Sequence, residues 1–575
     1  MGFDDLMLKL DEAVTGLLGQ WDATSTAIVG ALIAFVAYQI ITTRDPDAHP
    51  MLLARQAQAS PVRKEGESAV FRSHSAPHGM PLNSGLNVKD PGDSKWSRGR
   101  DGDLRDIWRI VMAGRRDKDG VATGETGDLL TVLGSEQIIK HNLVADVTRQ
   151  INLIGQHIKQ NGGKNVAIYL PNSIEFLAAL FACSFYDLTA ILVPYHQDDP
   201  VDKLISLLQK SGADTVIAAV GSFPFDVISK SYPALKQLIW VVDEGSKHMD
   251  WNEVPKGTGG PVNVSTWQDI IQDAATTAGS DLPLVDRTSE AKNVVAFWPT
   301  GEMVEYTNAN IIAGVAGQLT SIPTTQRITP EDLFLPIDSL STMYPLVLTL
   351  SALYSNASVA LNSVASFSPD IVLATQGIAP TVIVASAETL AKTHSETAAK
   401  MNSSLYQAVH WFQTRALVQQ GVMPIATVFS RMFDSLRPII GTTPGKLRLI
   451  FVSEPVGAPS TPLSAETLSD LRIYTGARTI YSLTSAKVAG AVTQTGLYDY
   501  RVDEGTDKYS HFGAPVTSVE IFFKDKTHKT TDANAAGEAR VSPLSIYARG
   551  PAVVGGEASL GVEGKTKADC TLALV

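Results

Sequence analysis

Residues 166–194 read VAIYLPNSIEFLAALFACSFYDLTAILVP, and this stretch decides the fold class. The apolar run Val166–Pro171 predicts a buried strand, Ile174–Tyr186 predicts an apolar helix, and Ala190–Pro194 predicts a second strand. Strands that alternate with helices at this spacing are typical of parallel sheets that carry helices on both faces. The stretch therefore predicts an α/β protein.

The same alternation extends along most of the chain. Ser135–Gln160 carries apolar residues at helical spacing, and Met401–Arg437 is interpreted as a helical insertion. A further helix is expected at Leu204–Gly212, and further strands are expected at Asp214–Ala219, Asn293–Trp298, Pro380–Ser386 and Leu447–Ser453. From about residue 500 the pattern changes to glycine turns and antiparallel strands, expected at Glu520–Asp525 and Glu538–Ala548. Residues 500–575 are therefore expected to form a small β lobe.

The composition excludes several classes of protein. The 575 residues include 44% hydrophobic and 18% charged residues, enough apolar surface for a packed core, so wholesale disorder is excluded. Two cysteines cannot build a disulfide framework, and no CxxC or His/Cys cluster suggests structural zinc. The 47 basic and 59 acidic residues give a net charge of −12, which argues against nucleic acid as a partner.

An uncharged run, ATSTAIVGALIAFVAYQIITT, occupies residues 23–43. At about 1.5 Å per residue it matches a bilayer core of about 30 Å, so it predicts one transmembrane helix; a secretory signal and a buried helix are the alternatives. Only Lys9 precedes the run, whereas four basic residues follow it closely: Arg44, Arg55, Arg63 and Lys64. This asymmetry predicts a single-pass protein with a short lumenal or external N-terminus, residues 1–22, and its bulk in the cytosol. The predicted membrane is that of the endoplasmic reticulum or of another organelle, since the sequence contains no motif that selects one.

The segment after this run differs from both of its neighbours. Residues 44–104 are rich in Pro, Gly, Ser, Arg and Asp and show no sustained period, and the segment is taken to extend to residue 114. Such a composition predicts a linker arm, either a tether or an arm along the surface. The folded domain is accordingly expected over residues 115–575.

The order of the segments resembles the AMP-forming acyl-CoA synthetase superfamily, most of all the membrane-anchored long-chain fatty acid–CoA ligases. The resemblance covers roughly Val147–Gly556 and is carried by five stretches in the family's order: Val166–Pro194, Asp332–Leu361, Ile480–Thr495, Phe512–Asp525 and Gly537–Pro551. It implies the N-terminal domain of an adenylate-forming enzyme, with two stacked parallel α/β subdomains and a small β lobe. It also implies ATP or AMP and Mg²⁺ as cofactors, provided that the site is active.

The family's phosphate loop, roughly aromatic-T-S-G-[ST]-T-G-x-P-K-G, falls on AFWPTGEMVEYTNAN (Ala296–Asn310). Thr300, Gly301 and Glu302 remain as a TGE and are the candidate nucleotide residues here. Pro299 has no N–H to donate, the Ser-Gly pair is missing, and no Lys lies between Lys292 and Lys392. Two interpretations stay open: a working phosphate loop, or a tight turn between a strand and a helix, which the missing donors favour.

The family's adenine and magnesium motif, Y-G-x-T-E, corresponds to Tyr481-Ser482-Leu483-Thr484-Ser485. By resemblance, Tyr481 would stack on adenine and Thr484 would reach the α-phosphate, which makes Thr484 the one remnant of the catalytic set. Ser485 stands where the metal-binding Glu is usual, and a neutral hydroxyl is a weak Mg²⁺ ligand. We therefore expect no metal site.

Candidate residues for a substrate pocket come from two further motifs. Long-chain ligases commonly read L-P-L-A-H-x-x-E where this chain reads LPIDSLS, which places Asp338 and Ser339 at the histidine position and Tyr344 in the apolar run that follows. The family's G-G-A-P corresponds to SEPVGAPS (Ser453–Ser460), which contains Gly457. The run Met343–Leu353 suits either a helix that lines an acyl tunnel or, more simply, a core helix.

The chain has 24 residues after Pro551 and no T-G-D among them. The ribose-binding Asp, the hinge and the lysine-bearing lid domain of the family are accordingly expected to be missing.

Three functions follow from these observations. The first is a membrane-anchored pseudoenzyme that binds a fatty-acyl or acyl-CoA ligand, or a protein partner, at the cytosolic membrane face. The second is a divergent but active long-chain fatty acid–CoA ligase that converts ATP to AMP and pyrophosphate. The third is a structural subunit of a membrane complex. The losses at the phosphate loop and at Ser485 favour a protein without adenylation activity.

Overall fold

The computed structural model describes residues 16, 19, 22–42, 44–89, 93–94, 96–115, 122–134, 137–195, 200–242, 262–283, 289–362, 370–425, 431–502, 508–524 and 544–575. The chain divides into two compact units, Met1–Asp47 and Ala48–Val575. Most of the predicted N-terminal segment 1–22 lies outside the described residues.

The first unit contains helix α2 (Ala23–Thr42), which coincides with the predicted transmembrane run. No helix in the described part of the chain has the length and apolarity that crossing a bilayer requires. The prediction of a transmembrane helix is therefore not supported.

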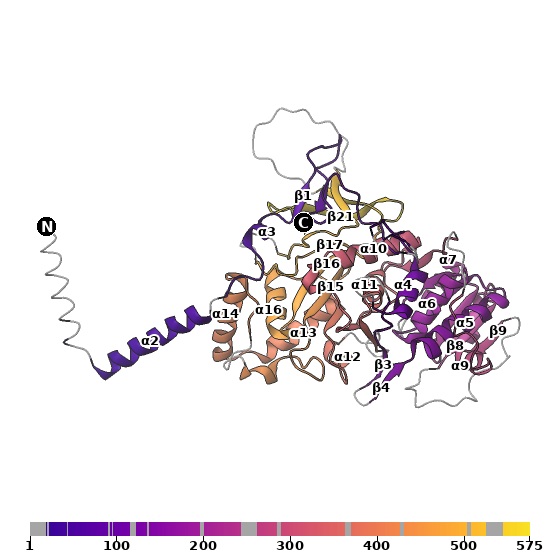
Figure 1. Ribbon diagram of the computed structural model, residues 1–575, viewed down its shortest axis with the longest axis horizontal. Coiled ribbons are helices and arrows are strands. Elements are labelled where there is room, and N and C mark those ends of the chain that lie inside the picture. The colour runs from indigo at the N-terminus through magenta and orange to yellow at the C-terminus, as the bar shows by residue number, and fades with distance from the viewer. Residues whose placement is uncertain are drawn as a thin grey trace. The chain divides into compact units, whose positions relative to one another are not determined.

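Seven strands form the first sheet of the second unit, as far as the described residues show. They lie in the order β11-β10-β6-β5-β7-β8-β9 and are parallel except for the β10–β11 pair. Their bounds are β5 (Asn165–Tyr169), β6 (Thr189–Leu192), β7 (Thr215–Ala219), β8 (Gln237–Val241), β9 (Asn263–Thr266), β10 (Val294–Phe297) and β11 (Met303–Tyr306). Helices α5 (Arg149–Gln160), α6 (Ile174–Phe185), α7 (Val201–Ser211), α8 (Phe225–Ser231) and α9 (Trp267–Gln272) accompany this sheet (Figure 1).

A nine-stranded sheet forms the second layer, counting only strands within the described ranges. Its order is β18-β17-β16-β15-β14-β12-β13-β3-β4, with a parallel centre and antiparallel pairs at both edges. The strands are β3 (Leu129–Leu133), β4 (Gln137–His141), β12 (Leu333–Pro336), β13 (Ser358–Leu361), β14 (Val382–Ser386), β15 (Leu449–Pro455), β16 (Arg478–Thr484), β17 (Ala491–Gln494) and β18 (Ala514–Pro515). The helices of this part are α10 (Asn308–Thr320), α11 (Met343–Tyr354), α12 (Ile371–Ala374), α13 (Ala387–Lys400), α14 (Ser404–Val418) and α16 (Ala465–Thr475).

The third sheet combines strands from the C-terminal part of the chain with two strands from the predicted linker arm. Its strands, in the order β1-β2-β19-β20-β21-β22, are β1 (Ala57–Ala59), β2 (Phe71–Ser73), β19 (Glu520–Lys524), β20 (Leu544–Arg549), β21 (Glu557–Thr566) and β22 (Leu572–Leu574). The first two come from residues 44–114, so the predicted linker arm is wrong for this stretch. Phe71 pairs with Ile521 across the sheet and both side chains are buried, which gives the arm an apolar anchor.

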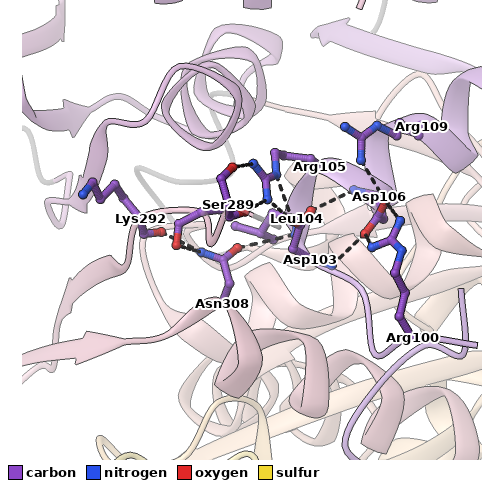
Figure 2. A network of polar contacts seen from close by, with 10 residues as sticks. Arg100, Asp103, Leu104, Arg105, Asp106, Arg109, Ser289, Lys292 and Asn308 are labelled. Atoms are coloured by element: carbon purple, nitrogen blue, oxygen red, sulfur yellow. Dashed lines mark hydrogen bonds and ion pairs between the residues drawn. The ribbon is translucent and has the colours of Figure 1, made fainter. Parts of the chain in front are cut away.

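The end of the same segment is anchored by helix α4 (Leu104–Ala113). Asp103 and Asp106 form a capping box at its first turn, and Arg100 and Arg109 pair with Asp106. Figure 2 shows how these residues continue into the rest of the unit, because Arg105 donates to the Ser289 carbonyl at 2.6 Å. Residues 100–113 thus belong to the folded body, although their composition suggested a tether.

The predicted helix Ser135–Gln160 is only partly correct. Ile138 and Ile139 lie in strand β4, a π-helix follows at η1 (Leu143–Thr148), and α5 begins at Arg149. The pairing of β4 with β3 competes successfully with helix formation, because short apolar runs fit either structure. Shorter elements complete the chain: α3 (Pro50–Ala54), η2 (Thr324–Gln326) and η4 (Asp434–Leu436).

Candidate functional site

The candidate residues of the nine-stranded sheet meet at one edge. In the parallel register Pro336 lies beside Val384, Ser386 beside Ser453, and Pro455 beside Thr484. These positions are the carboxyl ends of four neighbouring strands, where open α/β sheets usually bind their ligands. Asp338, Ser339, Gly457 and Ser485 follow directly after these ends. The structure therefore brings together the predicted pocket and nucleotide residues of this sheet.

The predicted phosphate loop is a tight turn between two strands, β10 and β11. The amide of Trp298 donates to the Glu302 carbonyl at 2.8 Å, and the amide of Gly301 donates to the Trp298 carbonyl at 2.8 Å. Gly301 has φ +82°, a conformation that favours glycine, and Thr300 and Glu302 are exposed. A phosphate loop needs free backbone donors, whereas the amides of Trp298 and Gly301 already serve the turn.

Two contacts join this turn to the edge of the nine-stranded sheet. The indole Nε1 of Trp298 donates to the carbonyl of Val456 at 3.1 Å. Lys487 Nζ pairs with Glu302 Oε1 at 2.5 Å. Lys487 is thus a cation close to the expected phosphates, but its charge is already matched by a carboxylate of the same chain.

The side chain of Tyr481 is 0% exposed, and its polar group is fully used. Its hydroxyl donates to Glu454 Oε2 at 2.7 Å and accepts from the amide of Leu463 at 2.9 Å. Its ring stacks on Phe512, with 4.7 Å between ring centroids. The ring that the resemblance assigns to adenine therefore packs against the protein itself.

Burial controls the ionisation of this pair. It raises the pKa of Glu454 to about 7, although the Tyr481 hydroxyl bond acts in the opposite direction. The pKa of Tyr481 is raised well above its usual value by its own burial and by the nearby Glu454. Glu454 is therefore a carboxyl that changes its charge near neutral pH inside the core.

The remaining positions of the adenine motif are also buried. Ser482 Oγ and the Tyr344 hydroxyl lie 2.8 Å apart, so the serine that replaces the family's glycine is bonded to helix α11. Thr484 Oγ1 donates to the Glu454 carbonyl at 3.3 Å, and the Thr484 carbonyl accepts from Val456 N at 2.9 Å. Leu483 and Ser485 are buried as well. Among the described residues no group of three or more His, Cys, Asp or Glu side chains could hold a metal ion.

The loop that carries Asp338 and Ser339 is held by Asn172, which belongs to the LPNS stretch. Asn172 donates to the carbonyl of Asp338 at 2.8 Å and accepts from the amide of Leu340 at 2.8 Å. Ser453 Oγ lies 3.3 Å from Asp338 Oδ2, and desolvation raises the pKa of Asp338 to about 7 even though its residue keeps some solvent-accessible surface. Ser339 contacts Ser341, with 2.9 Å between their hydroxyl oxygens.

Helix α11 packs as a core helix. Its residues from Met343 to Leu353 are all buried. A cavity beside Leu348 and Ser351 has a volume of about 10 Å³, which is room for roughly one water and not for an acyl chain. The packing therefore favours the core helix over the lining of an acyl tunnel.

Sequence reasoning did not single out Trp298, Lys487 and Asn172 as residues of the site. A signal was present for Glu454, which is a carboxylate at the end of an otherwise apolar strand and thus needs a buried partner. Trp298 and Lys487 carry no such signal. Their partners, Val456 and Glu302, lie more than a hundred residues away in the sequence, and only folding brings them together.

No family model matches this sequence, and no curated protein matches it. Solved structures do match. An anthranilate CoA ligase in complex with anthranoyl-AMP has a TM-score of 0.55 at 14% identity, over 82% of this chain and 77% of that chain. A long-chain-fatty-acid-CoA ligase from Archaeoglobus fulgidus has a TM-score of 0.54 at 11% identity, over 86% of each chain. The chain has the fold of the CoA ligases. A benzoate CoA ligase from Burkholderia xenovorans LB400 agrees, with a TM-score of 0.51 at 12% identity over 82% of this chain and 79% of that chain.

The CoA-ligase fold implies an ATP–Mg²⁺ complex, and the residues at the expected position do not fit one. A triphosphate needs donors and cations, but the amides of Trp298 and Gly301 serve the turn and Lys487 is paired with Glu302. Adenine needs an open aromatic face, but Tyr481 is buried against Phe512. Mg²⁺ prefers carboxylate ligands, and Ser485 provides only a hydroxyl.

Proposed function

We propose that this chain is an acyl-CoA synthetase-like protein that does not adenylate a substrate and acts by binding. The observation that carries the proposal is the buried contact of Tyr481, in the middle of β16, with Phe512 and with Glu454 near the carboxyl end of β15. To open this position for a nucleotide, Tyr481 would have to lose its hydrogen bond to the Glu454 carboxyl group and its stacking on the Phe512 ring. A nucleotide would have to compensate for these two lost contacts, although the nearby cation Lys487 is already paired with Glu302.

The chemistry that the residues can perform is accordingly limited. Among the described residues at this end of the sheet, no unpaired cation lies beside a carboxylate that could hold Mg²⁺. Nothing there would therefore stabilise the charge that develops on pyrophosphate as it leaves. The predicted ligands, a fatty-acyl chain, an acyl-CoA or a protein partner, remain proposals. The tight packing of α11 weighs against an acyl chain in the family's place.

The test is pyrophosphate release by the purified full-length chain with ATP, Mg²⁺, CoA and palmitate. We expect no release above a sample without protein, and no change in melting temperature with ATP and Mg²⁺. An active long-chain fatty acid–CoA ligase serves as the positive control. Release that disappears in Thr484→Ala would make the chain an active divergent ligase and would contradict the proposal.

Melting with palmitate and palmitoyl-CoA separates ligand binding from a purely structural role. A saturable rise in melting temperature with either compound supports a ligand-binding protein. No rise with either leaves the structural subunit as the better interpretation. Attachment to a membrane through residues 23–43 also remains a prediction, and resistance of the protein to alkaline extraction from membranes would test it.

A further inference from the structure

Helix α14 presents apolar side chains to solvent. Leu405, Trp411 and Phe412 are 60%, 56% and 49% exposed, and the two aromatic rings touch each other at 4.9 Å between centroids. Leu405 and Phe412 are seven residues apart, which places them on one face of a helix. Arg415 lies on the same face, one turn further, with its guanidinium 5.6 Å from the ring centre of Trp411. The outward face of α14 thus combines large apolar groups with a cation.

The inward face of α14 holds the helix to the body. Tyr406 and Leu417 are buried in a cluster with Phe433 and Tyr474. His410 of α14 and His394 of α13 both approach Asp470 of α16, at 3.1 and 3.0 Å. The three helices lie side by side in Figure 1. Because these contacts hold the inward face of α14 against the body, its outward face stays exposed to solvent.

Exposed apolar groups continue after α14. Ile425, Met432 and Ile439 are each more than half exposed. Isolated apolar residues on a surface are ordinary, but six within one segment of about 35 residues mark a binding surface. The apolar residues of this segment therefore need a partner that covers them.

The charge of the segment indicates which partner this is. Residues 401–447 contain four Lys or Arg, namely Arg415, Arg431, Arg437 and Lys446, and one acidic residue, Asp434, so their net charge is +3. The rest of the chain carries 43 basic and 58 acidic residues, a net charge of −15. An apolar surface with Trp, Phe and basic residues, on a protein that is otherwise strongly acidic, has the chemistry of anionic lipid binding.

We propose that the surface formed by residues 401–425 and 431–447, with the outward face of α14 at its centre, binds an anionic lipid bilayer. The apolar side chains enter the headgroup region, and the exposed basic residues Arg415, Arg431 and Lys446 face the anionic headgroups, whereas Arg437 is paired with Asp434. This surface belongs to the second compact unit, Ala48–Val575, and so it does not depend on helix α2. It also does not depend on whether the chain adenylates a substrate, because none of its residues lies at the carboxyl ends of β15 and β16.

The experiment uses the full-length chain with Leu32→Asp and Ile33→Asp, two exposed positions of α2, so that the apolar run of the first unit cannot contribute to vesicle binding. Flotation is measured with vesicles of phosphatidylcholine alone and of phosphatidylcholine with phosphatidylserine. We expect binding to the vesicles that contain phosphatidylserine and little binding to phosphatidylcholine alone. Two further pairs of substitutions, Trp411→Ala with Phe412→Ala and Arg431→Glu with Lys446→Glu, should each lower the vesicle affinity about tenfold or more.

Matched controls come from exposed residues outside the segment. Trp96 is 91% exposed and Lys159 is exposed on α5, so Trp96→Ala and Lys159→Glu repeat one substitution of each pair elsewhere. The single variants Trp411→Ala and Arg431→Glu are compared with them directly. The two controls should leave vesicle binding within about twofold, and circular dichroism should show that all variants are folded. No binding to phosphatidylserine vesicles, or equal loss in the controls, would overturn the proposal and leave a protein partner as the occupant. These outcomes do not involve pyrophosphate release, so this proposal and the proposed function can fail separately.

Discussion

Beside Glu454, near the carboxyl end of β15, Tyr481 is fully buried and its hydroxyl both donates and accepts a hydrogen bond. Trp411 on α14, by contrast, is more than half exposed and contacts Phe412 and Arg415. The first region occupies the place where an α/β sheet usually binds its ligand. The second lies in the segment that sequence reasoning interpreted as a helical insertion. In the first region Tyr481 packs against the protein itself, whereas in the second region large apolar side chains are exposed.

The two regions also differ in how they treat charge. At this end of the nine-stranded sheet Glu302 is paired with Lys487, and Glu454 accepts a hydrogen bond from Tyr481. Around α14 a groove of about 650 Å³ lies open beside Trp411, Arg415 and Asp470. This difference makes substitutions in the two regions distinguishable by experiment.

The largest effect is expected from Tyr481→Ala. The substitution removes a fully buried ring from Phe512 and leaves the Glu454 carboxyl without its hydroxyl partner. We expect the free energy of unfolding to fall by about 3–5 kcal/mol, measured by denaturant unfolding followed by circular dichroism. Trp411→Ala is the matched comparison and should cost less than about 0.5 kcal/mol, since its ring is largely in solvent. Equal losses in the two variants would remove the distinction between the regions.

The next effect concerns pH and the Glu454 carboxyl. Its pKa is raised from 4.5 to about 7 in the folded protein, so between these values the folded state keeps a proton that the unfolded chain has released. The contribution of this group to stability is therefore present below pH 4.5 and is lost as the pH rises to about 7, by about 3 kcal/mol in all. Glu454→Gln should remove this loss.

The measurement for this prediction is the difference in free energy of unfolding between the wild-type chain and Glu454→Gln, taken from pH 4 to pH 8 in one denaturant. Taking the difference cancels the other titrating groups, including Asp499, whose pKa is lowered to about 2 because its bonds to Arg501 and the nearby His511 outweigh its burial. The variant should gain relative to the wild type as the pH rises. A difference that stays constant with pH would show that Glu454 is not buried as the structure has it.

Much of the fold could be predicted from the sequence, because residues within Val166–Pro194 mark where each strand and helix begins and ends. The predicted strand, helix and strand of Val166–Pro194 correspond to β5, α6 and β6 within one or two residues at most ends. Pro171 and Asn172 separate the first strand from the helix, and the Ser173 hydroxyl caps the helix by accepting from Phe176 N. Such local signals remain visible without the tertiary structure.

The arm over residues 44–114 could not be predicted in the same way. Strands β1 and β2 are three residues long, too short to show a period, and β2 exists because Phe71 pairs with Ile521, which is 450 residues away in the sequence. The candidate site shows the same division. Motif order was enough to place Asp338, Gly457 and Tyr481 at one edge, but the closure by Trp298 and Lys487 depends on contacts between segments that only folding brings together.

A smaller effect is expected from Trp298→Phe, which keeps an aromatic ring and removes the indole donor to the Val456 carbonyl. Loss of one neutral hydrogen bond should cost about 1 kcal/mol. If this bond helps to hold the β10–β11 turn against the sheet edge, amide hydrogen exchange at residues 299–303 should become about fivefold faster. Trp96→Phe is the control, because that ring is exposed. Unchanged exchange in Trp298→Phe would mean that the turn is held by other contacts.

The smallest effect on stability is expected from Glu302→Gln. Glu302 and Lys487 are both more than one third exposed, and exposed ion pairs contribute at most about 0.5–1 kcal/mol. The substitution nevertheless frees Lys487, which lies beside the turn that corresponds to the family's phosphate loop. We expect no rise in melting temperature with ATP and Mg²⁺, because Tyr481 stays packed on Phe512 and Ser485 still replaces a carboxylate. A rise in Glu302→Gln that disappears when Lys487→Ala is added would show that a single surface ion pair keeps the nucleotide out, and that the packing around Tyr481 does not.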